Sequence, residues 1–138
     1  MEYILVYLTG AGLYGLLELS WRGWTHWTML LCGGACFSLM YLIAPSVLPM
    51  WRKCVLSAAA ITTVEFYTGC LVNLRLGWQV WDYSAMPFNL LGQICLPFTV
   101  LWFFLALLCI YADDWMRYIM FHEDKPHYHW RKVCKPKQ

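Results

Sequence analysis

The sequence predicts an all-α integral membrane protein with four transmembrane helices, and three of its features carry this prediction. First, 61% of the 138 residues are apolar and 13% are charged, whereas about 25% of a soluble domain is normally charged. Second, four apolar runs approach the roughly 20 residues that a helix needs to cross a membrane. They cover residues 3–19, 28–44, 54–74 and 90–112. Third, the basic residues are shared unequally between the segments that join these runs.

The basic residues favour an orientation with both termini in the cytoplasm, because short cytoplasmic loops are enriched in Lys and Arg. With the N-terminus inside, the outer loops hold only Arg22 and Arg75. The inner segments then hold the other eight basic residues, which are Arg52, Lys53, Arg117, Lys125, Arg131, Lys132, Lys135 and Lys137. We therefore expect a multi-pass protein of the cell membrane. Its transmembrane domain would cover residues 1–115, and a basic, aromatic cytoplasmic tail would cover residues 116–138.

The first apolar run carries small and polar residues on one face. We expect a retained helix rather than a signal peptide, because the run lacks a basic leading segment and contains Glu18. Ala11, Gly15, Glu18 and Arg22 follow one another at helical spacing and so share a face. Small residues let a neighbouring helix approach closely. Glu18 and Arg22 have the spacing and order of a favourable i, i+4 ion pair.

The second run and the loop before it predict a tight helix contact and an interfacial anchor. Residues 32–36 read Cys-Gly-Gly-Ala-Cys and have little side-chain volume, so we expect another helix to pack closely on them. Trp21, Trp24 and Trp27 lie in the first outer loop or beside it. Tryptophan is enriched where a membrane meets water, so these three residues indicate an aromatic belt.

The third run resembles the first. A shift of 47 positions places three residues of the first run, Ala11, Gly15 and Glu18, on Ala58, Thr62 and Glu65. Both runs would start on the inner side. The pattern favours two repeated helical hairpins related by an axis along the membrane normal, a layout that some transporters use.

The second outer loop contains the sequence Trp-Asp-Tyr-Ser at residues 81–84. Asp82 is expected to accept backbone N–H groups of this turn or to cap a short helix. Asn89 is expected to cap the fourth transmembrane helix in the same way. Pro97 lies inside the fourth apolar run, where proline removes a backbone hydrogen bond and would kink the helix.

The polar residues within and beside the apolar runs form the candidate functional site. Polar groups are costly inside a membrane, so they commonly mark a working site. The candidates for binding a substrate or an ion are Glu18, Arg22, His26, Glu65, Asn73, Asp82, Tyr83 and Asn89. We expect them to line a cavity open toward the outer side. The alternative is an internal network of salt bridges and hydrogen bonds that only locks the helices together.

Several kinds of site are not expected. The sequence has no P-loop, dinucleotide-binding or zinc-protease motif, so the chain does not hydrolyse ATP by itself, and no nucleic-acid surface is indicated. The seven cysteines contain no C-x-x-C pair. The tail residues His122, His127, His129 and Cys134 do not have the spacing of a closed metal site. We expect no metal and no cofactor.

Several short motifs resemble a known family. They are Tyr14-Gly15-x-x-Glu18, Arg22-Gly23, Gly33-Gly34, Trp81-Asp82-Tyr83-Ser84, Asn89-x-x-Gly92-x-x-Cys95-Leu96 and Trp102. Together they resemble the CmpB-type "putative ABC-transporter type IV" membrane family over residues 10 to 105. Members of that family often have Asn-Arg-Gly in the first loop, where this chain has Trp21-Arg22-Gly23. The resemblance implies a multi-pass membrane protein with a role in transport.

Three functional hypotheses follow. In the first, the chain is a permease-like or transport-associated protein, in which Glu18 and Glu65 bind a cation or exchange protons. It would work beside membrane lipids, as a homodimer or with a partner membrane or ATPase subunit. In the second, the chain is an enzyme acting on a lipid of the outer leaflet, with Glu18, His26 and Asp82 close together. In the third, it is a structural or regulatory subunit without a reaction of its own. We lean away from the enzyme.

Overall fold

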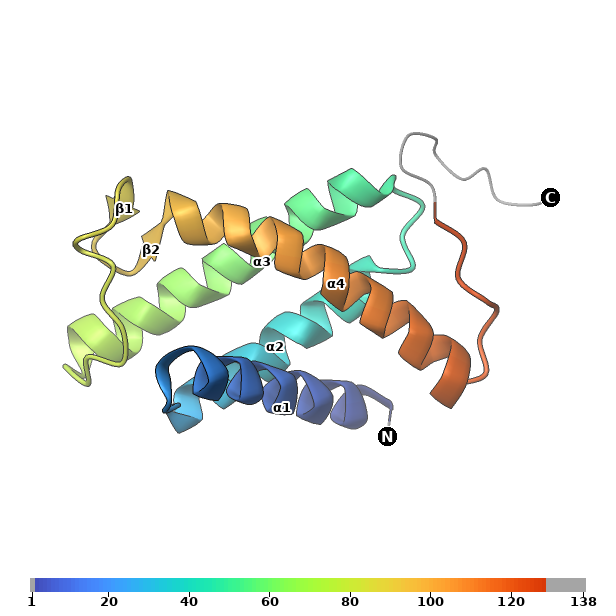
Figure 1. The fold of residues 1–138 in the computed structure, drawn as a ribbon, viewed down its shortest axis with the longest axis horizontal. Helices are drawn as coiled ribbons and strands as arrows, with labels where there is room; N and C mark the ends of the chain where they lie inside the picture. The colour runs from blue at the N-terminus through green and yellow to red at the C-terminus, as the bar shows by residue number, and fades with distance from the viewer. Residues whose placement is uncertain (1, 129–138) are drawn as a thin grey trace.

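The computed structural model describes residues 2–128 and confirms an all-α membrane fold. The four helices are α1 (Glu2–Arg22), α2 (Trp27–Ile43), α3 (Met50–Gly69) and α4 (Leu96–Met120). A π-helical segment, η1 (Cys70–Arg75), continues α3. Two short antiparallel strands, β1 (Asn89–Leu90) and β2 (Ile94–Cys95), precede α4 (Figure 1).

Three of the helical segments are long and apolar enough to cross a membrane. These are α1, α3 together with η1, and α4, with 21, 26 and 25 residues. The fourth, α2, is apolar but has only 17 residues. At 1.5 Å per residue it is about 25 Å long, which is slightly less than the typical hydrocarbon thickness of about 30 Å.

The helices form two hairpins, α1–α2 and α3–α4, and α2 packs on both helices of the second hairpin. Within the described residues, α1 makes no substantial backbone contact with α3 or α4. The start of α1 and the end of α4 lie at the same end of the bundle (Figure 1). The basic residues predict this end to be cytoplasmic, and it is called the cytoplasmic end below. The opposite end, with the α1–α2 connection and the long segment between η1 and α4, is called the outer end below.

The α1–α2 hairpin is held by close approach at glycines, as the small residues predict. A Cβ atom added at Gly33 would lie 2.4 Å from the Cβ atom of Tyr14, and one added at Gly10 would lie 2.2 Å from that of Phe37. Real Cβ atoms do not approach so closely. The ring of Tyr7 similarly covers Gly34. Only glycine at these positions allows the two helices to lie at their observed separation.

Two predictions about the fourth helix, its first residue and a kink at Pro97, are wrong. The helix begins at Leu96 rather than at residue 90, and the residues before it form the strands β1 and β2. Leu91 and Gly92 both have positive φ angles, +54° and +67°, which an α-helix does not allow. Pro97 lies in the first turn of α4, where its missing N–H has no helical partner to lose. It therefore starts the helix and does not kink it.

Asn89 does not cap α4. Its side-chain nitrogen donates hydrogen bonds to the backbone oxygens of Ser84 and Met86, and its side-chain oxygen accepts from the N–H of Gly92. These bonds fold the loop before the helix onto itself. The residue at the N-cap of α4 is Cys95, which makes no side-chain capping bond.

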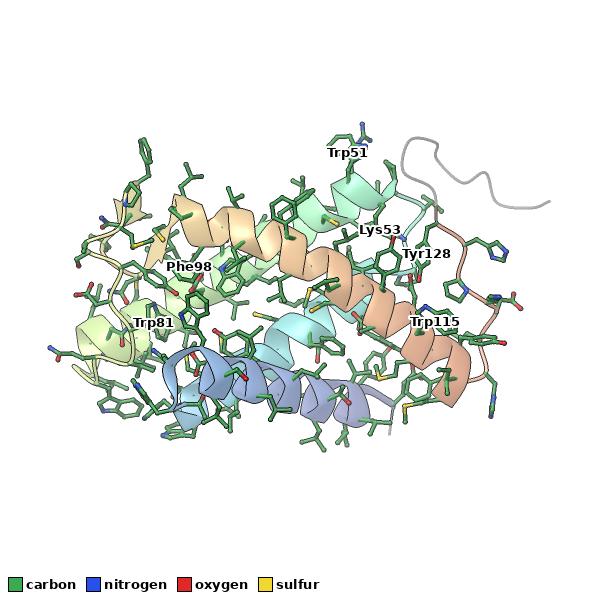
Figure 2. All side chains as sticks on the ribbon, viewed as in Figure 1. Trp51, Lys53, Trp81, Phe98, Trp115 and Tyr128 are labelled. Atoms are coloured by element: carbon green, nitrogen blue, oxygen red, sulfur yellow. The ribbon has the colours of Figure 1, made fainter. Side chains whose placement is uncertain are left out.

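The surface is apolar around most of its circumference, which fits a protein surrounded by lipid. Many large apolar side chains of α1 and α4 are exposed, for example Leu8, Leu16, Phe104 and Leu108. Figure 2 shows Lys53 and Tyr128 near the cytoplasmic end, and Trp81 and Phe98 near the outer end.

Candidate functional site

Two carboxylates lie buried in the part of the bundle nearest the outer end. Glu18 in α1 is 6% exposed and Glu65 in α3 is 4% exposed. They are the two acidic residues that the predicted internal repeat places at equivalent positions. The structure gives each of them a different set of partners, described in turn below.

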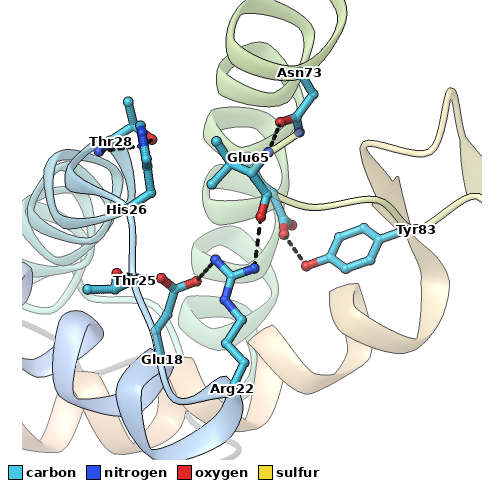
Figure 3. A network of polar contacts seen from close by, with 9 residues as sticks. Glu18, Arg22, Thr25, His26, Thr28, Glu65, Asn73 and Tyr83 are labelled. Carbon is cyan, nitrogen blue, oxygen red and sulfur yellow. Dashed lines mark hydrogen bonds and ion pairs between the residues drawn. The ribbon is translucent and has the colours of Figure 1, made fainter. Parts of the chain in front are cut away.

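Glu65 is held between the second outer loop and α4. The Tyr83 hydroxyl donates to one carboxylate oxygen over 2.9 Å, and the Trp102 indole N–H donates to the other, also over 2.9 Å (Figure 3 shows the Tyr83 bond). The Tyr83 ring stacks on Phe98 of α4, with ring centroids 4.7 Å apart. Burial raises the pKa of the Tyr83 hydroxyl, and the negative charge of Glu65 raises that pKa further. Tyr83 therefore remains a protonated donor at neutral pH.

Glu18 forms the predicted ion pair with Arg22. The distance between Arg22 Nη2 and a Glu18 oxygen is 2.8 Å, and the Thr25 hydroxyl donates to the other oxygen over 2.6 Å (Figure 3). Arg22 Nη1 also donates to the backbone oxygen of Val80 over 2.9 Å. Arg22 thus connects the first hairpin to the second outer loop. The ring of Trp24 lies 4.4 Å from the guanidinium, within the range of a cation–π contact.

Asn73 supports the second outer loop and does not contact either carboxylate. Its amide nitrogen donates to the side-chain oxygen of Gln93 over 2.8 Å, and its oxygen accepts from the backbone N–H of Val80 over 2.7 Å. The Trp81 indole N–H donates to the backbone oxygen of Gln93 over 3.0 Å. This set of bonds fixes the chain just before Tyr83, so it positions the Tyr83 hydroxyl against Glu65.

Asp82 bonds within its own turn, as predicted. One oxygen accepts from the Ser84 hydroxyl at 2.5 Å and from the Ser84 backbone N–H at 2.8 Å. These two bonds lower the pKa of the exposed Asp82 carboxyl. Asn89 belongs to the same turn through its bond to the Ser84 oxygen. Asp82 and Asn89 therefore shape the loop, and their hydrogen bonds within residues 2–128 do not reach the buried carboxylates.

His26 is the N-cap of α2. Its Nδ1 atom accepts from the Thr28 backbone N–H, and its ring contacts Trp27 and Trp78. In the described part of the chain, the contacts of His26 and Asp82 do not join either residue to Glu18. The acid–base set that a lipid enzyme would use is thus not assembled by the observed contacts.

Two hollows adjoin the buried carboxylates. A small apolar cavity of about 80 Å³ lies in the centre of the bundle and is lined by Glu65, Trp102 and the thiols Cys32 and Cys36, among others. A larger groove of about 700 Å³ lies between α1 and α4. Glu18, Arg22 and Tyr83 contribute to its wall, together with Trp102. We call Glu18, Arg22, Glu65 and Tyr83 the polar cluster. Each hollow is mainly apolar but has at least one residue of this cluster in its lining.

The structure shows no candidate metal site in residues 2–128, where no group of three or more His, Cys, Asp or Glu side chains converges. Two members of the tail set, His129 and Cys134, lie outside the described residues.

Sequence reasoning missed three residues that matter to the site. Trp102 and Thr25 each bond a buried carboxylate, and Gln93 fixes the loop that carries Tyr83. Trp102 offered a signal, because tryptophan within a membrane span needs a partner for its N–H. Asp113, which directly follows the fourth predicted apolar run, is fully buried. Neither of its oxygens has a hydrogen-bond partner among the described residues.

Comparison with known proteins gives one family. The model of a family described as "Putative ABC-transporter type IV" matches residues 4–130. This stretch contains α2, α3 and α4, all of α1 except its first two residues, and both outer connections. No curated protein and no solved structure matches the chain.

Proposed function

The chain belongs to this family, and from that premise we propose that it is the permease-like membrane component of a transport system. In this proposal the polar cluster at the outer end of the bundle is the site that receives the transported substrate or a coupling cation. The fold supports the coarser part of the statement, because its apolar helices are those of a multi-pass membrane protein.

The observation that carries the proposal is the burial of Glu65 beside a cavity. A carboxylate inside a membrane bundle is costly, and packing alone would be served by an apolar residue of similar volume. Glu65 lines the central cavity and accepts hydrogen bonds from two neutral donors, Tyr83 and Trp102. No cation of the described residues forms a salt bridge with it. Its carboxyl group therefore has no charged partner among these residues and is available to a cationic group or a proton.

Glu18 and Arg22 give the site its second polar position. They lie in the wall of the groove between α1 and α4, which also includes Tyr83 and Trp102. The two residues that bond Glu65 thus line the same groove as the ion pair. A substrate entering along the groove would meet the ion pair and the Glu65 donors together. Movement of Tyr83 or Trp102 would then open the way to Glu65.

In this proposal the chain works with other subunits, because it has no nucleotide-binding motif and encloses little space. Its sequence contains no nucleotide-binding motif, so transport driven by ATP would require a separate ATPase subunit. Four helices enclose little space, and the central cavity holds only about 80 Å³. A complete path across the membrane would therefore be formed by a homodimer or by this chain with another membrane subunit.

The proposal is tested by comparing solute distribution in cells that produce the wild-type chain or the Glu65→Gln variant at equal membrane levels. Small molecules in the cells and in the medium are quantified by untargeted mass spectrometry. Glu123→Gln is the matched control, because Glu123 pairs with Arg117 at the cytoplasmic end, where its side chain is 46% exposed. We expect at least one solute to change its distribution with the wild type and the control but not with Glu65→Gln. Equal solute profiles for all three proteins would refute the proposal.

A structural or regulatory subunit is the second candidate function. It is favoured by one observation, which is that all four carboxylate oxygens of Glu18 and Glu65 have partners within the protein. A subunit of this kind would require the carboxylates only for assembly. In the experiment above, the solute profile of the cells would then follow the amount of assembled complex and not the charge of residue 65.

A further inference from the structure

The groove between α1 and α4 has the form of a binding site that opens sideways into the membrane. Its two walls are helices that make no substantial backbone contact within the described residues. Large apolar side chains line it along α4 and the outer half of α1, including Leu17, Leu101, Phe104 and Leu108. These side chains are largely exposed in the isolated chain. The volume of about 700 Å³ is within the usual range of about 300–1,000 Å³ for a small-molecule site.

The outer end of the groove is polar and includes a cation with unused hydrogen-bond donors. Arg22 lies in the groove wall, where its side chain is 24% exposed. A guanidinium has five N–H donors, and the hydrogen bonds of Arg22 to described residues use one from each terminal nitrogen. Its Nε atom is buried and has no acceptor in this part of the chain, so the donors left for a ligand are the second N–H groups of the two terminal nitrogens. Arg22 can therefore donate hydrogen bonds to an anionic group while it keeps its bond to Glu18.

The length of the apolar part suits one hydrocarbon chain. On α4 the groove extends from Phe98 to Leu108, a rise of about 15 Å at 1.5 Å per residue. The tryptophan belt around Trp21 is at the polar end, where lipid headgroups are expected to lie. The polar end and the apolar length thus follow the order of headgroup and chain in an outer-leaflet lipid.

We propose that this groove binds a single-chain anionic amphiphile from the outer leaflet, with its chain between α1 and α4 and its anionic headgroup on Arg22. The inference rests on the proposed function and names the class of substrate that the site would receive. A second copy of the chain is the other occupant to consider. It is less suited, because the acidic side chain that α1 carries at this depth, Glu18, is already paired with Arg22 of its own chain.

Native mass spectrometry of the purified full chain in a neutral detergent tests the proposal. The probe is hexadecyl phosphate, and hexadecyl maltoside is the comparison with the same chain and an uncharged headgroup. We expect one saturable hexadecyl phosphate per chain, and binding of hexadecyl maltoside about tenfold weaker. Inorganic phosphate alone should not compete, since the chain contributes to affinity. Equal binding of the two amphiphiles, or displacement by inorganic phosphate, would overturn the proposal.

Two leucines of α1 provide a matched pair of variants. Leu17 lies in the groove wall and Leu19 does not, and their exposed fractions are similar, 42% and 47%. Leu17→Trp fills the groove and should weaken hexadecyl phosphate binding at least tenfold, whereas Leu19→Trp should leave it unchanged. Arg22→Lys keeps the charge and should retain part of the headgroup preference, which Arg22→Gln should abolish. Unaltered binding to Leu17→Trp contradicts the proposal, as does a dimer without bound amphiphile in the wild type.

The outcomes separate this inference from the proposed function. If hexadecyl phosphate does not bind while Glu65→Gln still abolishes the change in solute distribution, the groove inference fails and the transport proposal stands. If hexadecyl phosphate binds as described while Glu65→Gln has no effect on solutes, the groove inference stands and the transport proposal fails.

Discussion

The hydrogen bond from Tyr83 to Glu65 should stabilise the fold measurably, and Tyr83→Phe removes it with the smallest change in volume. The bond joins the second outer loop to a carboxylate that is 4% exposed. Hydrogen bonds to charged groups contribute about 1.5–3 kcal/mol in soluble proteins, whereas bonds between membrane helices average about 0.6 kcal/mol with a maximum near 1.7. Because the acceptor is a buried carboxylate, we expect a loss near the top of the membrane range, about 1.5 kcal/mol.

The measurement is the free energy of unfolding in mixed micelles with an increasing fraction of denaturing detergent. Tyr67→Phe is the control, because Tyr67 is on α3 with an exposed fraction of 70% and should change stability by less than about 0.5 kcal/mol. A double-mutant cycle with Glu65→Gln then isolates the pair. The coupling should be favourable, since the neutral amide accepts a weaker bond than the carboxylate. Loss of the Tyr83 hydroxyl without any effect on stability, or a cycle without coupling, would refute this reasoning.

Three further predictions concern the scaffold around the site. Gly33→Ala places a methyl group 2.4 Å from the Cβ atom of Tyr14 and should cost about 1–3 kcal/mol of unfolding free energy, whereas Gly12→Ala, with open space around it, should not destabilise. Gly92→Ala combines a positive φ angle with a contact of 2.5 Å to a hydroxyl of the turn, so circular dichroism and thermal unfolding should show a less stable, though still helical, protein. Asp82 has a lowered pKa in the folded chain. The stability contributed by the Asp82 carboxylate should be complete above the unfolded pKa of about 3.9 and should decline as the pH falls through the lower folded value. Unfolding midpoints measured from pH 6 to pH 2 should therefore depend less on pH in Asp82→Asn than in the wild type.

The parts of the fold that depend on neighbouring residues along the chain could be predicted from the sequence. The pair of Glu18 and Arg22 forms because a helix alone brings positions i and i+4 together. The glycines of α2 predicted a close helix contact for an equally local reason, which is their lack of side-chain volume. Hydrophobic run length gave the number of helices and, for α1 and α2, nearly their bounds.

The parts that depend on contacts between distant segments could not be predicted. Residues 90–95 are mostly apolar and were therefore expected to be helical. Gly92 instead packs against the turn that contains Asp82, and α4 begins only at Leu96. The partner of Glu65 on α4 could be any polar residue near the same depth, and only the packing of α3 on α4 selects Trp102. The burial of Asp113, which directly follows the fourth predicted apolar run, could not be predicted for the same reason.

The most direct test of the central claim asks whether Glu65 holds a ligand or only the helices. The full chain is released from membranes in a mild detergent and its mass is measured by native mass spectrometry, for the wild type, Glu65→Gln and Glu123→Gln. We expect a reproducible small-molecule adduct on the wild type and on Glu123→Gln, and its loss from a folded Glu65→Gln protein. An adduct that persists on Glu65→Gln, or its absence from all three proteins, would contradict the claim and favour a carboxylate that serves only assembly.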